Sequence, residues 1–158
     1  MALNMAVGVT GPWDKEDHLP AEHFLYMRVL KDDIDDEGWP EPRIFRNHTD
    51  EHGVAAMSTD WSKYCNPEGT QLRARRRSPS DYGVISLGVG EVLTIPHQAV
   101  SHAPIFNRPE NPQDPNNRAH TNVLGPKSKK DPYGSVEIRA RYIAIVRVIG
   151  WAVKPPSK

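Results

Sequence analysis

The stretch "DYGVISLGVGEVLTI", residues 81–95, is the clearest β-strand pattern in the chain. Its β-branched and apolar residues form a run of the composition that strands favour. Gly88 and Gly90 interrupt the run, and glycines inside a strand pattern are typical of a β-bulge or a tight turn. The stretch therefore predicts a protein built around a sheet, with a bulge or a hairpin near these two glycines.

Further apolar passages predict the strands that pair with it. They are residues 23–30, 53–61, 98–106 and 146–153, with a weaker strand or turn at 43–47 and a short run at 121–124. Most of these passages are only a few residues long and are separated by prolines, glycines and polar residues, which mark turns and loops. This spacing favours antiparallel neighbours over parallel strands joined by long crossovers.

Two segments carry the start signals of helices. Asn66 is a good N-cap residue, and Pro67 follows at the first helical position, where its missing N–H costs nothing. A second helix is expected to begin after Asp131 or Ser135, because the apolar residues that follow recur at helical spacing.

Length and composition bound the architecture. A chain of 158 residues suits one domain and can bury a core without a disulfide or a metal. The 15 prolines predict long irregular segments. We therefore expect a single α+β domain, with a mostly antiparallel sheet of about five strands, two short helices and long irregular loops. Residues 1–20 are expected to form an irregular N-terminal arm, and 21–158 the domain.

The expected compartment is the cytoplasm. The single cysteine, Cys65, excludes an internal disulfide and a zinc site built on several thiolates, and it fits a reducing environment. The N-terminus lacks the basic and apolar regions of a signal peptide. No apolar run is long enough to cross a bilayer, so no membrane partner is expected.

The zero net charge conceals a strong polarity along the chain. Residues 1–60 contain 5 Lys and Arg against 13 Asp and Glu, whereas residues 61–158 contain 15 against 7. The acidic excess peaks at 31–41 and the basic excess at 71–78. A basic region of this kind attracts phosphates, an acidic partner, or the acidic segment of the same chain.

The basic run "QLRARRRS" predicts a phosphate-binding face. On a continued helix Arg73, Arg76 and Arg77 would share one side, where guanidinium groups bind phosphate in bidentate fashion. Lys127 is a further candidate from a second basic cluster. We therefore expect RNA, DNA or a nucleotide as partner, and flanking aromatic residues would stack on bases. The alternative is a solvated helix face that binds nothing.

A polar loop at 107–119 leads to the candidate catalytic residues. Long loops in compact domains are usually functional or disordered, and this one ends at Arg118 and His120. Their side chains point the same way if the segment is extended, so they could act as a phosphate clamp and a general acid or base. His102 is the third candidate, with His97, Thr121 and Lys127 as possible supplements. In the alternative interpretation, Asn117 and His120 bind backbone groups and pin the loop to the sheet.

A second pattern concerns Arg28, on the first predicted strand, and Ser58, in the later stretch "AAMSTDW". This pair resembles the mono-ADP-ribosyltransferases, in which a first-strand arginine contacts a phosphate of NAD and a serine braces the nicotinamide pocket. The resemblance implies an NAD-using enzyme with a catalytic glutamate, for which Glu91 and Glu137 are the candidates. Neither has the partner residue of the family's Gln-x-Glu or Glu-x-Glu pair. Alternatively, Arg28 forms an ion pair with the acidic loop at 32–37.

Several familiar motifs are absent. The chain has no P-loop, no Rossmann glycine pattern after a strand, no HExxH and no GxSxG. His48 and His52 lie four residues apart, but Thr49 stands where zinc enzymes need a glutamate, so we interpret 48–53 as a polar turn. No metal and no cofactor are expected.

Two classes of function follow. The first is a protein that contacts RNA, DNA or a nucleotide through its basic part, and in its stronger form it is a metal-independent phosphodiesterase or toxin-like enzyme using histidine and arginine. The second is a non-catalytic module that binds another protein within a larger assembly. An enzyme should gather His120, Arg118 and a further titratable group into one cleft. An interaction module should instead leave these residues dispersed and expose an apolar patch, around Trp13 and Trp39.

Overall fold

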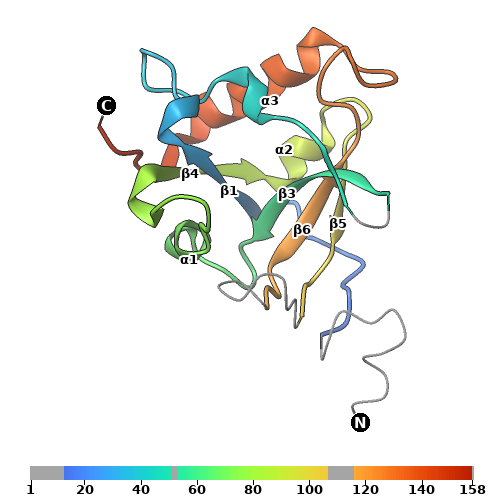
Figure 1. The fold of residues 1–158 in the computed structure, drawn as a ribbon. Coiled ribbons are helices and arrows are strands. Elements are labelled where there is room, and N and C mark those ends of the chain that lie inside the picture. The colour runs from blue at the N-terminus through green and yellow to red at the C-terminus, as the bar shows by residue number, and fades with distance from the viewer. Residues whose placement is uncertain (1–12, 51–52, 107–115, 158) are drawn as a thin grey trace.

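The protein is a single α+β domain in which one antiparallel sheet carries helices on both faces (Figure 1). A computed structural model describes residues 13–50, 53–106 and 116–157. Within these residues the sheet has seven strands, more than the five expected, and every strand pairing is antiparallel.

The strands run in the order β5-β6-β3-β1-β4-β7. Their bounds are β1 Phe24–Leu30, β3 Ala55–Trp61, β4 Tyr82–Gly88, β5 Ala99–His102, β6 His120–Leu124 and β7 Trp151–Val153, and the short β2, His48–Thr49, pairs with β3. The helices are α1 Pro67–Leu72, α2 Val89–Leu93 and α3 Val136–Ile149, with 3-10 turns at Lys31–Asp33, Pro42–Ile44 and Pro79–Asp81.

The centre of the sheet is the pairing of β1 with β4. It runs without interruption from Phe24 opposite Gly88 to Leu30 opposite Tyr82. Six of the seven residues of β4 are buried, because α3 and α1 cover its opposite sides (Figure 1). A strand that is buried on both faces needs a continuous apolar run rather than an alternating one, and residues 82–88 supply it.

The glycines that follow β4 end the strand instead of bending it. The expected bulge or hairpin is wrong: β4 stops at Gly88 and α2 begins directly at Val89. Gly90 lies against the backbone of the preceding segment, and its N–H donates to the Ala21 carbonyl at 3.0 Å. A Cβ at Gly90 would approach that residue within about 3.0 Å, so close backbone contact accounts for the glycine.

The long helix α3 extends further than the sequence suggested. The expected strand at 146–153 is confirmed only for Trp151–Val153, which form β7, and is wrong for 146–149, which continue the helix. Val146 extends the buried face formed by Ile138, Tyr142 and Ile145. Burial of this helical stripe outweighs the β-propensity of the valines and isoleucine. Gly150 ends the helix with φ of +85°, a conformation that glycine adopts readily.

Helix α1 begins as predicted and then ends early. The Asn66 side chain accepts the N–H of Gly69 at 2.7 Å, which confirms the cap. The last helical residue is Leu72, so the basic run from Arg73 to Arg77 lies beyond the helix. The expectation that Arg73, Arg76 and Arg77 share one helix face is therefore wrong.

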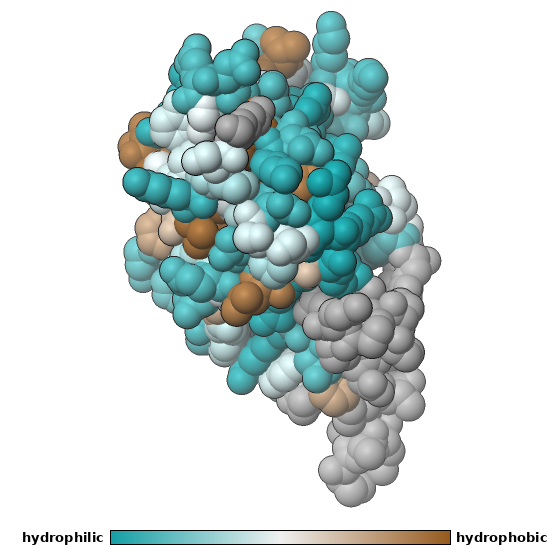
Figure 2. Space-filling model, turned by 60° about the vertical axis from the view of Figure 1, so that its left-hand side comes forward, coloured by the Kyte–Doolittle hydropathy of each residue, from teal (hydrophilic) through white to brown (hydrophobic). Residues whose placement is uncertain are grey.

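The described part of the N-terminal arm, residues 13–20, contains no helix or strand. Glu16 anchors it through the Lys63 ammonium, at 2.5 Å, and the Tyr64 hydroxyl. Among the described helices, none has the length and apolar character needed to cross a membrane. On the face drawn in Figure 2 the surface is mainly hydrophilic, and hydrophobic residues are scattered over it rather than gathered in one patch.

Candidate functional site

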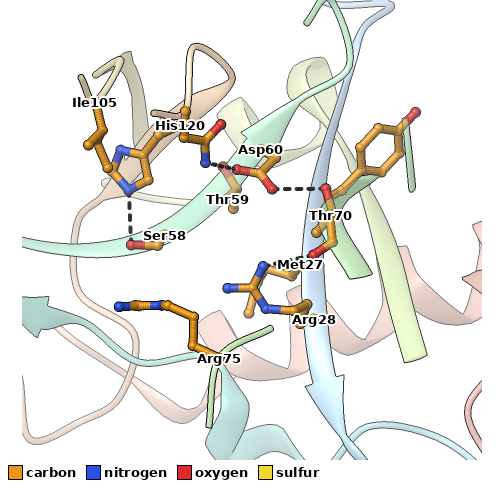
Figure 3. A pocket seen from close by; sticks show the side chains of 11 residues that line it. Met27, Arg28, Ser58, Thr59, Asp60, Thr70, Arg75, Ile105 and His120 are labelled. Carbon is orange, nitrogen blue, oxygen red and sulfur yellow. Dashed lines mark hydrogen bonds between the residues drawn. The ribbon is translucent and has the colours of Figure 1, made fainter. Parts of the chain in front are cut away.

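The candidate site is an opening inside the sheet, between β1 and β3. These strands share only two ladder positions, Leu25 opposite Trp61 and Tyr26 opposite Asp60. Beyond Tyr26, β1 continues along β4 and β3 continues along β6, so the two strands diverge. The divergence leaves a cleft of about 130 Å³, drawn in Figure 3. We call this opening the first cleft.

The first cleft is lined mainly by polar and charged side chains from strands far apart in sequence. Its lining residues are Tyr26, Met27, Arg28, Ser58, Thr59, Asp60, Thr70, Arg75, Ile105, Asn117 and His120.

A hydrogen-bonded network fixes one end of the first cleft. The buried Asp60 carboxylate accepts from the Thr70 hydroxyl at 2.9 Å and from the Asn117 amide at 2.8 Å. The Arg28 guanidinium donates to the Thr70 carbonyl at 2.8 Å (Figure 3). Asp60 is therefore a structural residue, because a buried carboxylate needs such donors, and it positions Thr70 and Asn117 at the cleft wall.

His120 enters the first cleft from the beginning of β6. Its Nδ1 lies 2.8 Å from the Ala103 carbonyl and its Nε2 lies 3.2 Å from the Ser58 hydroxyl (Figure 3). A carbonyl only accepts, so Nδ1 carries a proton and donates it. In the neutral ring Nε2 is then the acceptor, and the Ser58 hydroxyl donates to it. The lone pair of a neutral imidazole thus faces the cleft.

Two arginines supply positive charge at the same place. Arg28 projects from β1 and Arg75 from the segment after α1, and both line the first cleft with Ser58. Figure 3 shows their guanidinium groups on the same side of Ser58. A histidine base beside two guanidinium groups can bind a phosphate and accept a proton from a hydroxyl next to it.

A larger cleft of about 420 Å³ continues from the first, and we call it the second cleft. The two share Met27, Arg28, Ser58 and Arg75 as walls. The second cleft adds Asp33, Arg43, Ile44, Arg46, His48, Met57, Arg76 and Tyr82. Burial lowers the pKa of His48, and the charges of the neighbouring Arg46 and Arg76 lower it further.

The structure brings only one of the three candidate catalytic residues to the first cleft. His120 lines it, whereas the Arg118 guanidinium lies over the Tyr64 ring, 4.2 Å from its centroid, and is not part of the lining. The two side chains do not point the same way, because Arg118 lies in a turn before β6 begins. Asn117 and His120 do bind backbone groups, at the Ala119 N–H and the Ala103 carbonyl, as the alternative interpretation expected.

His102, the third candidate, is fully buried away from the cleft. Its Nδ1 accepts the Glu16 N–H at 3.0 Å and its Nε2 donates to the Arg118 carbonyl at 2.7 Å. Its ring packs edge-on against Trp61. Both nitrogens are thus engaged with backbone groups, and His102 ties the N-terminal arm to the turn that precedes β6.

The candidate phosphate-binding residues are similarly dispersed. Only Arg76 lines a cleft, the second one. Arg73 lies 3.9 Å from the Asp60 carboxylate, and Arg77 pairs with Asp32 of the acidic segment at 3.3 Å. Part of the basic run therefore contacts the acidic segment of the same chain.

Lys127 is buried rather than exposed. Its ammonium donates to the Asn47 side chain at 2.9 Å and to the carbonyls of Val123 and Gly125 at 3.1 and 2.7 Å. Burial lowers its pKa to about 8. A lysine with no exposed surface and three intramolecular acceptors contributes to the fold and cannot reach a phosphate.

The pair that resembles the ADP-ribosyltransferases comes together, but its glutamate does not. Arg28 and Ser58 line the first cleft from neighbouring strands, and Arg28 forms no ion pair with the described residues 32–37. Glu91 lies on α2 and Glu137 on α3, and neither lines either cleft.

No metal centre emerges from the residues that the structure describes, in which no three His, Cys, Asp or Glu side chains lie close enough to hold an ion. His52 falls outside them. Comparison of the chain with protein-family models, curated proteins and solved structures finds no match in any of the three.

Sequence reasoning did not single out Arg43, Arg46 or Arg75 as site residues. Arg75 is part of the basic run, but on a helix it would lie on a different side from Arg73, Arg76 and Arg77. Arg43 and Arg46 lie within "RIFRN", residues 43–47, which we interpreted only as a weak strand or turn. Two arginines close to His48 in the sequence were the one sign that this segment could form a basic wall of a cleft.

Proposed function

We propose that the protein binds RNA, DNA or a nucleotide by its phosphate in the first cleft and that His120 acts there as a general base. The protein would then be a phosphodiesterase that draws its base and its cations from its own side chains. The observation that supports this proposal is the convergence of the His120–Ser58 hydrogen bond with Arg28 and Arg75 in one cleft.

The proton balance for an RNA substrate follows from the tautomer of His120. A ribose 2′-hydroxyl replaces the Ser58 hydroxyl as donor to Nε2 and gives up its proton there. The 2′-oxygen attacks the adjacent phosphorus, the bond from phosphorus to the 5′-oxygen breaks, and the leaving oxygen takes a proton from water. The hydroxide that remains takes the proton from the His120 imidazolium, which restores the base. Arg28 and Arg75 stabilise the charge that develops on the phosphoryl oxygens, which is the principal contribution of fixed cations in such reactions.

The test compares His120→Asn with the wild-type protein on short RNA. Asparagine keeps a donor near the Ala103 carbonyl but offers no base, so we expect binding to be retained and cleavage to fall by about 10²–10⁴-fold. His18→Gln is the matched control, since His18 is an exposed histidine outside both clefts. Cleavage that persists in His120→Asn would refute the catalytic role.

Binding is tested separately with Arg75→Gln. Arg75 is exposed, so the variant should fold, and loss of one phosphate contact should weaken binding and reduce its salt dependence. Unchanged affinity at low salt would contradict phosphate binding in the first cleft.

A second candidate function rests on the position of Arg28 beside Ser58. This is the arrangement that the resemblance to ADP-ribosyltransferases implies, so NAD is a candidate ligand of the same cleft. Incubation with NAD labelled in its nicotinamide distinguishes the two: release of labelled nicotinamide that depends on Arg28 and Ser58 would favour this candidate. Intact NAD together with cleaved RNA would favour the first.

The alternative of a protein-interaction module has support from one of its two expectations, because the Arg118 and His102 side chains lie away from His120. Its other expectation has less support. Trp13 and Trp39, around which an exposed apolar patch was expected, are both half-buried. Trp13 packs edge-on against Phe106, and Arg147 lies over the Trp39 ring.

A further inference from the structure

We propose that the second cleft binds the continuation of a single-stranded polynucleotide whose reacting phosphate lies in the first cleft. This inference rests on the proposed function and narrows its ligand from any nucleotide to a chain with several phosphates.

The size of the first cleft is the first step of the argument. Its volume of about 130 Å³ lies below the roughly 300–1,000 Å³ typical of sites that enclose a small organic ligand. It has room for a phosphate and the hydroxyl that faces His120, while a base and a second sugar must lie elsewhere.

The second cleft adjoins the first and provides that space. Its volume of about 420 Å³ falls in the range of ligand sites, and it shares Arg28, Ser58 and Arg75 with the first cleft. A ligand whose phosphate contacts Arg28 and Arg75 is therefore already at the entrance of the second cleft.

The charge of the second cleft selects a ligand with more than one phosphate. Five arginines line it, Arg28, Arg43, Arg46, Arg75 and Arg76, against one carboxylate, Asp33. Arg43 pairs with Asp33 at 3.1 Å, and Arg46 and Arg76 line the second cleft without lining the first. Arg46 and Arg76 also act on His48 as described above. A mononucleotide with its phosphate in the first cleft would not use Arg46 and Arg76.

The remaining walls suit unpaired bases. Tyr82 and Ile44 add an aromatic ring and apolar surface among the arginines. Aromatic rings beside guanidinium groups are the usual platform for single-stranded nucleic acids, in which bases stack and the backbone follows the cations. A duplex would keep its bases paired and would not use these walls.

The experiment measures affinity against ligand length. Adenosine monophosphate, a dinucleotide and a pentanucleotide, each as RNA and as DNA, are titrated by fluorescence anisotropy or calorimetry at low and raised salt. We compare wild type with Arg46→Gln/Arg76→Gln, with Arg75→Gln, and with Lys129→Gln/Lys130→Gln. The last variant removes the same number of charges from exposed lysines outside both clefts.

The expected pattern is specific to the second cleft. Wild type should bind the pentanucleotide at least about tenfold more tightly than the monophosphate, and Arg46→Gln/Arg76→Gln should lose that gain while binding the monophosphate unchanged. The slope of log affinity against log salt for the pentanucleotide should fall by about 1.4, since each phosphate contact on a single strand contributes about 0.7. The lysine variant should match wild type. Arg46 and Arg76 are exposed, so the substitutions do not endanger the fold.

The two proposals fail in different ways. Equal affinity for all lengths, with no effect of Arg46→Gln/Arg76→Gln, overturns the polynucleotide inference while leaving a nucleotide site that Arg75→Gln weakens. No binding of any ligand overturns both. The RNA and DNA arms show whether the 2′-hydroxyl adds to affinity.

Discussion

Replacing Lys127 by methionine should change how the stability of the protein depends on pH. The Lys127 ammonium has no exposed surface and donates to three acceptors, among them the Asn47 side chain and the Gly125 carbonyl. Methionine fills a similar volume without a charge. The variant leaves these acceptors without their donor, which lowers the free energy of unfolding by an amount that does not depend on pH. The informative quantity is therefore the part of the stability difference that changes with pH.

The size and sign of that part follow from the pKa of Lys127. Burial lowers it from 10.5 to about 8, against the opposing charge of Asp131. Between the folded and unfolded pKa values, Lys127 is still protonated in the unfolded chain but has lost its proton in the folded protein. Wild-type stability therefore rises with pH across this range. The full gain is about 3 kcal/mol at 1.36 kcal/mol per pKa unit. Below about pH 8 both states are charged and the penalty of burying the ammonium is complete.

The assay is urea unfolding of wild type and Lys127→Met over a series from about pH 7 to about pH 10.5. Burial raises the pKa of Tyr142, which gives an alkaline pH dependence of its own, but that contribution is common to both proteins and cancels in the difference. The stability difference should be flat near pH 7 and should grow in favour of wild type above pH 8. Lys129→Met, at an exposed lysine, should show no such trend. A difference that stays constant, or shrinks with rising pH, would refute the lowered pKa.

Three further substitutions test single features of the fold by the same unfolding measurement. Asn66→Ala removes the cap of α1 and should cost about 1 kcal/mol, whereas an unchanged midpoint would mean that the bond to the Gly69 N–H contributes nothing. Gly125→Ala should cost at least about 3 kcal/mol, because φ is +111° and a Cβ would lie 2.1 Å from a backbone carbonyl oxygen; a loss below about 1 kcal/mol would show that the loop can move. Tyr142→Phe removes the buried 2.6 Å bond to Gln98 and should cost about 1–3 kcal/mol, and a stabilised variant would contradict this.

The elements that the sequence predicted correctly are those with a local cause. Residues 82–88 form a strand because their unbroken apolar run is buried on both faces. Helix α1 begins at Pro67 because the Asn66 side chain satisfies an amide of the first turn. The end of α3 has no such local cause: residues 146–149 favour a strand by composition, and only the packing of Val146 in the core keeps them helical.

The candidate site was predictable only in part for a similar reason. His120 attracted attention because it follows a long polar loop, and the structure places it in the first cleft. No residue pattern within 24–30 or 55–61 indicates that the two strands separate beyond the Tyr26–Asp60 pair. The sequence therefore could not show where a cleft would open. Lys127, flanked by polar residues, has the composition of an exposed loop residue. Its burial depends on acceptors that converge only in three dimensions.

The short pairing of β1 with β3 also divides the sheet into two groups of strands that are joined at one place. One half contains β1, β4 and β7, the other contains β2, β3, β5 and β6, and within the described strands their edge-to-edge pairing is confined to the two positions near Trp61. Arg28 belongs to the first half, whereas Ser58 and His120 belong to the second. Arg28 and Ser58 lie on the open side of this pivot, and His120, which stands opposite Asp60, reaches Ser58 with its side chain. A small change in the angle between the halves would therefore alter the separation of Arg28 from Ser58 while the pivot itself stays packed. The width of the opening thus depends on the angle between the halves, and the cation and the base stand on opposite sides of it.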